Sequence, residues 1–144
     1  MERMAEPIPH SDDQGLQHFF TNSGWNDQLV INQLVQDADQ LIGGNKDSCL
    51  IIDENGIPKK TKSVDVAGQW CGQLGKAENC QFGVYSVLCF QDHAAPIENR
   101  LFLPEAWVND KKKCLKTGIA QEHIDFHRKH NLALQLVIQA CLQV

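Results

Sequence analysis

The sequence lacks any apolar run long enough to cross a membrane, and it lacks an export signal. Its continuous hydrophobic stretches are only a few residues long, whereas a membrane-spanning helix needs about 20. The first residues, Met-Glu-Arg-Met-Ala-Glu, carry charge and no apolar segment follows them, which excludes a secretory signal peptide. These absences predict a soluble protein that works in the cytoplasm and has no membrane partner.

Pairs of cysteines at metal-binding spacing are also absent. No C-x-x-C motif occurs, so a structural zinc site is poorly supported. Without an export signal, the six cysteines are expected to stay reduced. Two of them lie in apolar runs, where a thiol behaves as a small hydrophobic group. We therefore expect free structural thiols at Cys49, Cys71, Cys80, Cys89, Cys114 and Cys141.

The chain has no excess of positive charge. Its 13 lysines and arginines are outnumbered by 18 acidic residues, which gives a formal net charge of −5. This balance argues against a broadly basic, nucleic-acid-binding surface. Two local clusters depart from it, and the ordinary interpretation of such clusters is a solvated surface. They consist of Lys59, Lys60 and Lys62, and of Lys111, Lys112 and Lys113.

The first part of the chain is predicted to be helical. Its 144 residues suit one compact domain rather than two. Ser11–Gln14 has the Ser-x-x-Gln form of a capping box. Leu16, Phe19 and Phe20 follow at helical spacing, which predicts a short amphipathic helix.

A second helix is predicted from about Trp25 to Ile42. Ser23 is a suitable residue to cap its start, and Gly43 and Gly44 are suitable to end it. Apolar residues recur along it at intervals of three and four. Its buried stripe is therefore expected to consist of Val30, Leu34, Ala38 and Leu41.

From Cys49 onward, the residue pattern changes from one typical of helices to one typical of strands. Cys49–Ile52 is a continuous apolar run, typical of a strand buried on both faces, and Asp53–Gly56 is predicted to be a turn. Residues 82–90 and 97–103 predict two more strands, and residues 131–142 an apolar helix. The sequence thus predicts an α/β fold with N-terminal helices and three strands. Such a sheet still needs a partner strand, so we expect a truncated chain with exposed, aggregation-prone surfaces.

Asp53 is the most informative single residue. A carboxylate directly after a buried strand lies at the end of the sheet where α/β proteins place their ligands. Burying it is costly unless a cation or hydrogen bonds compensate, and Mg²⁺ prefers such oxygen ligands. The alternative is an ordinary Asx-type turn residue, and the residues by themselves leave both interpretations open.

The sequence around Asp53 resembles a motif of a known protein family. Residues 49–64, CLIIDENGIPKKTKSV, resemble the first catalytic motif of insertion-sequence DDE transposases, in the group named after insertion sequence seven-zero-one. The resemblance covers nearly the whole chain, in order and with few gaps. It includes residues 16–20, 23–25, 66–67, 69–76, 79–81, 83–84, 100–107 and 132–134.

This resemblance implies a partial ribonuclease-H-like fold, a mixed sheet flanked by helices whose first strand ends in a catalytic aspartate. That role falls on Asp53. In the family, two aspartates and one glutamate hold two divalent ions, Mg²⁺ or Mn²⁺, which activate water or a DNA 3′-hydroxyl for cleavage and joining of transposon ends. Residues 1–46 are then an N-terminal helical region and residues 47–144 the first part of the catalytic domain. Lys59, Lys60 and Lys62 become candidates for contacts to DNA.

The chain also departs from the family. The second aspartate is expected after the helix that contains Leu132 and the glutamate much later, and the chain ends first; it also begins late. Glu54, Asp65 and Asp92 receive none of the missing roles, and Glu54 is expected to point away from Asp53. Two hypotheses follow: a transposase fragment that is inactive alone, or a remnant that binds DNA or the full-length transposase and interferes with it. Smaller departures occur at Asp65, Gly68, His130 and Asn131.

Three further patterns give only weak support for a binding site. His123 and His127 would share a face if their segment is helical, with His130 nearby, yet no other metal ligand accompanies them. Gly72 and Gly75 miss the spacing of a phosphate-binding loop. The aromatic rings of Trp70 and Trp107 are suited to stacking on bases, but filling the core is the favoured interpretation.

Overall fold

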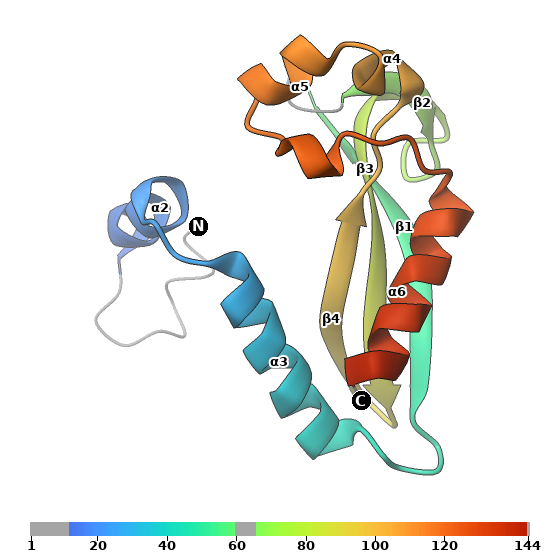
Figure 1. Cartoon of the computed structure of the whole chain (residues 1–144). Coiled ribbons are helices and arrows are strands. Elements are labelled where there is room, and N and C mark those ends of the chain that lie inside the picture. The colour runs from blue at the N-terminus through green and yellow to red at the C-terminus, as the bar shows by residue number, and fades with distance from the viewer. Residues whose placement is uncertain (1–11, 60–65, 144) are drawn as a thin grey trace. The chain divides into compact units, whose positions relative to one another are not determined.

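A computed structural model describes residues 12–59 and 66–143 (Figure 1). The chain forms two compact units, one ending at Val30 and the other beginning at Ile31. The predicted division into residues 1–46 and 47–144 stays a prediction. Among the described residues, no helix is long and apolar enough to cross a membrane.

Helix α2 (Asp13–Asn22) confirms the first predicted helix. Its N-cap is Asp12, whose Oδ1 accepts a hydrogen bond from the Gly15 backbone N–H at 2.5 Å. The predicted capping residue, Ser11, lies outside the described residues. The ring of Phe19 stacks on Trp25 with a centroid distance of 5.8 Å.

Helix α3 (Asp27–Ile42) confirms the second predicted helix. At its start, the Asn26 side chain accepts from the Leu29 N–H at 3.3 Å, so Asn26 rather than Ser23 serves as the cap. Gly44 follows its end with a φ of +62°, a conformation that glycine adopts without strain.

The buried face of α3 differs from the predicted stripe. Leu41 is 78% exposed and Val30 is exposed as well. Because apolar residues occur on more than one side of this helix, periodicity could not decide which side packs against the sheet. The residues buried are Val35, Ala38 and Ile42.

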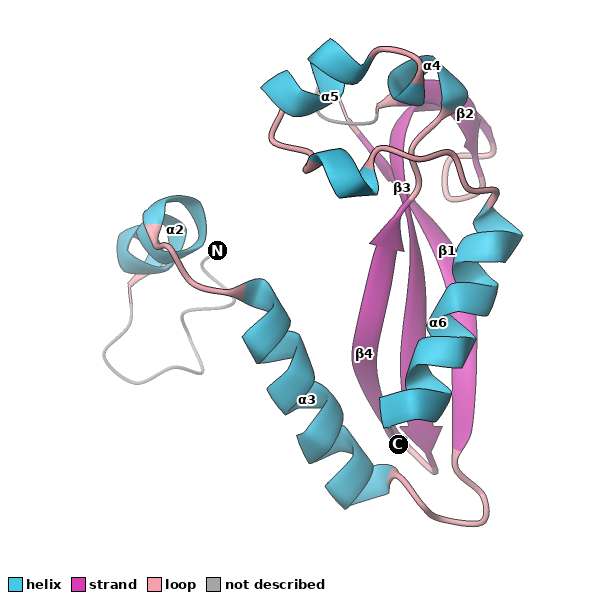
Figure 2. Ribbon diagram, viewed as in Figure 1, coloured by secondary structure: helices cyan, strands magenta, loops and turns pink. Residues whose placement is uncertain are grey.

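The described residues form four strands rather than three: β1 (Cys49–Pro58), β2 (Ala67–Cys71), β3 (Lys76–Phe90) and β4 (His93–Leu101). β3 is central, and all pairings among them are antiparallel (Figure 2). β1 follows one edge of β3, while β2 and β4 share the other edge, at opposite ends. The α/β class is confirmed.

The predicted end of β1 at Ile52 was wrong. The strand continues to Pro58, and Asp53–Gly56 pairs with residues of β3 instead of turning. Fifteen residues of β3 offer backbone partners, and this pairing overrides the local turn preference of Asp, Asn and Gly. Gly56 is needed in this pairing, because a Cβ there would lie 2.6 Å from the Phe82 ring.

The extents of the other strands were also only partly predicted. β3 begins at Lys76, six residues before the predicted start at Phe82, and β4 begins at His93 rather than Ile97. β2 was missed, because its sequence, AGQWC, contains one glycine and no run of β-branched residues.

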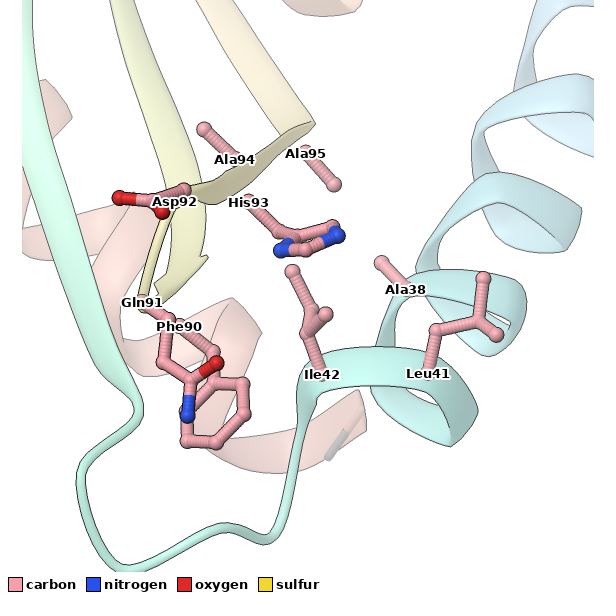
Figure 3. Close-up of a pocket in the computed structure, with 9 residues that line it drawn as sticks. All are labelled: Ala38, Leu41, Ile42, Phe90, Gln91, Asp92, His93, Ala94 and Ala95. Atoms are coloured by element: carbon pink, nitrogen blue, oxygen red, sulfur yellow. The ribbon is translucent and has the colours of Figure 1, made fainter.

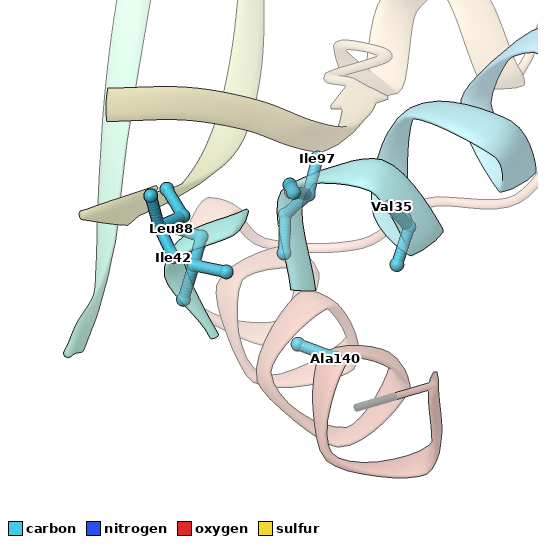
Figure 4. Packing of buried hydrophobic residues seen from close by; sticks show 6 residues of the cluster. Val35, Ile42, Leu88, Ile97 and Ala140 are labelled. Carbon is cyan, nitrogen blue, oxygen red and sulfur yellow. The ribbon is translucent and has the colours of Figure 1, made fainter. Parts of the chain in front are cut away.

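Two helices cover one face of the sheet. The long C-terminal helix α6 (Lys129–Gln143), which confirms the predicted apolar helix, packs Leu132 and Leu136 against Val84 of β3. α3 packs on the same face, where its buried residues meet one residue of α6 (Figure 4). This cluster consists of Val35, Ala38, Ile42, Leu88, Ile97 and Ala140.

A polar contact fixes α6 to β4. Glu98 is buried and accepts a hydrogen bond from Gln139 Nε2 at 3.1 Å. Arg100 forms an ion pair with Glu98 at 3.0 Å and also donates to Gln139. The buried carboxylate is therefore compensated by a charge and a hydrogen bond, as a buried acid requires.

The other face of the sheet is not covered by these helices. On β1, the residues that point to this face are all exposed, and Ile51 is 49% exposed. The prediction that Cys49–Ile52 is buried on both faces was therefore wrong for the described residues, since α3 and α6 lie on the same side. We call this the open face; on β1 it consists of Cys49, Ile51, Asp53, Asn55 and Ile57.

The segment between β4 and α6 forms a small separate core. It contains α4 (Glu105–Val108), α5 (Lys111–Lys116) and the 3₁₀ turn η1 (Gln121–His123). Trp107 is buried there against Cys114 and Ile124, so its predicted core role is confirmed. Trp70 is 67% exposed, and the core interpretation was wrong for that residue.

Candidate functional site

Asp53 lies in the middle of β1, directly opposite Tyr85 of β3. The side chain belongs to the open face and is exposed. It lines a hollow of about 310 Å³ together with Glu54, Asn55 and Tyr85. The expected position at the end of a strand was wrong, but a rigid strand still holds the carboxylate toward open space.

The hydrogen bonds of Asp53 leave most of its carboxylate available. Its Oδ1 accepts from the Glu54 backbone N–H at 2.8 Å. Within residues 12–59 and 66–143, no lysine, arginine or histidine forms an ion pair with it. An exposed carboxylate without a protein cation retains the lone pairs with which it can bind an added one.

Glu54 points to the opposite face of the sheet, as the sequence predicted. Successive residues of a strand alternate between faces, and the Oε2 of Glu54 lies 2.8 Å from Lys129 Nζ of α6. That ammonium also lies 3.7 Å from the centroid of the Phe82 ring. Glu54 therefore anchors α6 and is not a second ligand beside Asp53.

The remaining acidic candidates do not join Asp53 either. Asp92 lies in the turn between β3 and β4, where it lines a different pocket of about 570 Å³ together with Leu41 and Ile42 of α3 (Figure 3). Asp65 lies outside the described residues.

The donors around Asp53 do not by themselves fit a divalent metal centre. Besides Glu54, whose carboxylate pairs with Lys129, the lining residues offer the Asp53 carboxylate, the Asn55 amide and the Tyr85 hydroxyl. In the described part of the chain, no group of three histidine, cysteine or acidic side chains could hold an ion. Two cations need several carboxylates from separate elements, so we assign no metal-dependent step to this chain.

Only one residue of the first lysine cluster can be placed. Lys59 follows β1 directly, and its N–H donates to the Asn79 carbonyl at 2.9 Å, which extends the β1–β3 ladder by one pair. Lys60 and Lys62 lie outside the described residues. The cluster therefore stays a prediction as a DNA contact.

The histidine pair does not share a helical face. His123 ends the 3₁₀ turn η1, and His127 lies in the irregular segment before α6. His127 Nε2 is 3.5 Å from Asp125 Oδ2. His130 belongs to α6, so these residues are distributed over three different local structures.

Sequence reasoning missed Asn55 and Tyr85 as neighbours of Asp53. Asn55 was assigned to a turn, although it lies two positions along β1 and hence on the same face. Tyr85 is more than 30 positions away in the sequence and is brought opposite Asp53 by the register of β1 against β3. The only aromatic hydroxyl of the chain was the available signal, but register is a tertiary property.

Known proteins resemble this chain over most of its length. The sequence model of one family, described as DDE superfamily endonuclease, matches residues 1–143. Over 92 residues, the chain is 34% identical to "Probable transposase for insertion sequence element IS701" from Microchaete diplosiphon. This match covers 62% of the chain and 24% of that relative, so the chain spans about a quarter of the relative's length. No solved structure matches.

Proposed function

Because this chain belongs to the DDE superfamily of endonucleases, we propose that Asp53 is the first of three catalytic carboxylates of a DNA transposase, and that the isolated chain is inactive. The observation that carries this proposal is the single, exposed carboxylate on the open face of β1, without a protein cation among the described residues. The substrate of the complete enzyme would be DNA at the transposon ends. Its cofactor would be Mg²⁺ or Mn²⁺, which carboxylates bind.

The inactivity follows from the chemistry of phosphoryl transfer. Two divalent ions stabilise the attacking and the leaving oxygen during an in-line displacement, and several carboxylates are needed to fix them. Of the two acidic residues that line the hollow, Glu54 directs its carboxylate to Lys129 of α6, which leaves the Asp53 carboxylate without a protein cation among the described residues. The chain therefore needs the second aspartate and the glutamate from another segment or another chain.

The test is a DNA-cleavage assay. We expect the purified chain, given Mg²⁺ or Mn²⁺, to produce no nicking or joining of supercoiled DNA that carries transposon ends. The Asp53→Ala variant serves as the matched control and should give the same background. Metal-dependent nicking that Asp53→Ala abolishes would show that the chain is active alone and would contradict the proposal.

A second function, binding to an intact transposase, is favoured by the outer edge of β1, which pairs with no other strand among the described residues. Lys59 donates its backbone N–H to the carbonyl of its direct partner Asn79, and hydrogen-bonded pairs alternate along an antiparallel ladder. The backbone groups of odd-numbered residues in β1 therefore hydrogen-bond to β3. Even-numbered residues then direct their backbone groups away from β3. One contact agrees: the Glu54 N–H donates to the side chain of its neighbour Asp53 and not to β3. An unpaired strand edge is a template for strand addition from another chain.

This second function predicts interference without catalysis. Co-expression of the chain with a full-length transposase of the family should lower the transposition frequency, and Asp53→Ala should lower it equally. Glu54→Pro removes an edge N–H and should relieve the interference, whereas Glu54→Ala, which also loses the Lys129 ion pair, should not. Undiminished transposition with the soluble wild-type chain would rule this function out.

A further inference from the structure

Two cysteines face each other across the β1–β3 ladder. Cys49 of β1 and Cys89 of β3 are direct partners in the register. The Cα atoms of direct antiparallel partners lie about 4.5–5.5 Å apart, and their side chains project to the same face. Disulfides span Cα separations of roughly 4.4–6.8 Å. Both thiols are free in the structure, so the register holds two free thiols at a Cα separation that a disulfide can span.

This pair is accessible from solution. Cys49 is exposed and Cys89 is half-buried. Both belong to the open face, away from the cores of α3 and α6. We propose that Cys49 and Cys89 form a modification site, a cross-strand dithiol that a hydroperoxide oxidises to a disulfide. This inference is independent of the proposed function, although the disulfide would link β3 covalently to β1, the strand that carries Asp53.

The reaction balances with one peroxide. The thiolate of one cysteine attacks a peroxide oxygen, which breaks the O–O bond and gives a sulfenic acid and, with one proton, water. The second thiol attacks the sulfenic sulfur and displaces hydroxide, which leaves as water with the proton of that thiol. Two thiols and one hydrogen peroxide thus give one disulfide and two waters.

A second cysteine pair provides an internal comparison. Cys71 and Cys80 are fully buried in one core cluster, and their thiols are hydrogen-bonded to each other. Burial, and then the hydrogen bond to Cys71, raise the pKa of the Cys80 thiol. Since the thiolate is the nucleophile, and access is also needed, this pair should react at least about tenfold more slowly than Cys49 and Cys89.

The bridge should also be easy to reduce. Odd-numbered residues of β1 form the hydrogen-bonded type of pair, as the Lys59–Asn79 bond implies. In this type the strands hold the side chains further apart than in the other type. Closing a disulfide there draws the strands together, and a strained disulfide is more readily reduced.

The experiment treats the reduced, full-length chain with hydrogen peroxide and alkylates the remaining thiols with iodoacetamide. We expect an intramolecular loss of two hydrogen atoms and alkylation of four of the six cysteines. Trypsin should then release residues 47–59 joined to residues 77–100. Glutathione should remove this linkage.

Three variants assign the bridge. Because Cys80 also lies in the peptide of residues 77–100, the linkage must disappear in Cys89→Ser as well as in Cys49→Ser. In Cys89→Ser, the sulfenic acid at Cys49 should be trapped by dimedone. Cys141→Ser, which removes an exposed thiol on α6, should retain the linkage. Far-UV circular dichroism verifies the fold of each variant.

Several outcomes would overturn the proposal. One is alkylation of all six cysteines after peroxide treatment of the wild-type chain. This result is measured on the wild-type chain alone and does not depend on the folding of any variant. Another is a linkage between residues 63–76 and 77–100, because it would place the first bridge at Cys71 and Cys80. A linkage that persists in Cys89→Ser, or oxidation that yields only intermolecular dimers, would do the same.

Discussion

Replacing Trp107 with alanine is expected to lower the free energy of unfolding by about 3–5 kcal/mol, the usual cost of removing a large buried aromatic side chain. Trp107 is 3% exposed and packs against Cys114 and Ile124. Its indole N–H donates to the Val66 carbonyl at 3.2 Å, and Lys113 Nζ lies 3.7 Å from the ring centroid. Alanine would remove these contacts together and leave a cavity beneath α4 and α5.

The chain contains a matched control for this change. Trp70 is 67% exposed, so Trp70→Ala should change the free energy of unfolding by no more than about 0.5 kcal/mol. Urea denaturation followed by far-UV circular dichroism measures both variants with the same probe. Equal destabilisation by the two substitutions would contradict the assignment of Trp107 to the core.

The second large effect concerns self-association. α6 exposes an apolar stripe on the side away from the sheet, where Leu134 and Ile138 lie one turn apart. Ile51 exposes a further apolar side chain on the open face. No charged residue follows Lys129 in α6, so nothing on this stripe opposes association between copies. We therefore expect the wild-type chain to self-associate and to aggregate.

Lysine substitutions test this expectation. Burying one isoleucine side chain contributes roughly 1.5–3 kcal/mol, which corresponds to about a 10- to 100-fold change in association constant. Ile138→Lys and Ile51→Lys should each weaken self-association by that order in sedimentation equilibrium. Leu115→Lys is the control, since Leu115 is 51% exposed, comparable to Ile138 at 53% and Ile51 at 49%, but lies on α5. A wild-type chain that is monomeric and melts cooperatively would show that these surfaces do not drive association.

The length of β1 illustrates what local sequence could not predict. Asp53, Asn55 and Gly56 favour a turn when considered by themselves. In the fold, β3 supplies backbone partners along all ten residues of β1, and the ladder prevails. The histidines show the converse error: a spacing of four between His123 and His127 suggests a helical face only when a helix forms, and here the segment between η1 and α6 is irregular.

By itself, the sequence determined the existence of α2, α3 and α6, the caps of α2 and α3 to within a few residues, the α/β class and the family motif around Asp53. These properties depend on neighbours three or four positions apart or on an ordered run of residues, which a linear pattern records. The tertiary structure decided which side of α3 is buried, that α3 and α6 cover the same face of the sheet, and that Tyr85 lies opposite Asp53. Register and the choice of a buried face are settled by contacts between distant segments, because only packing decides among faces that are all partly apolar.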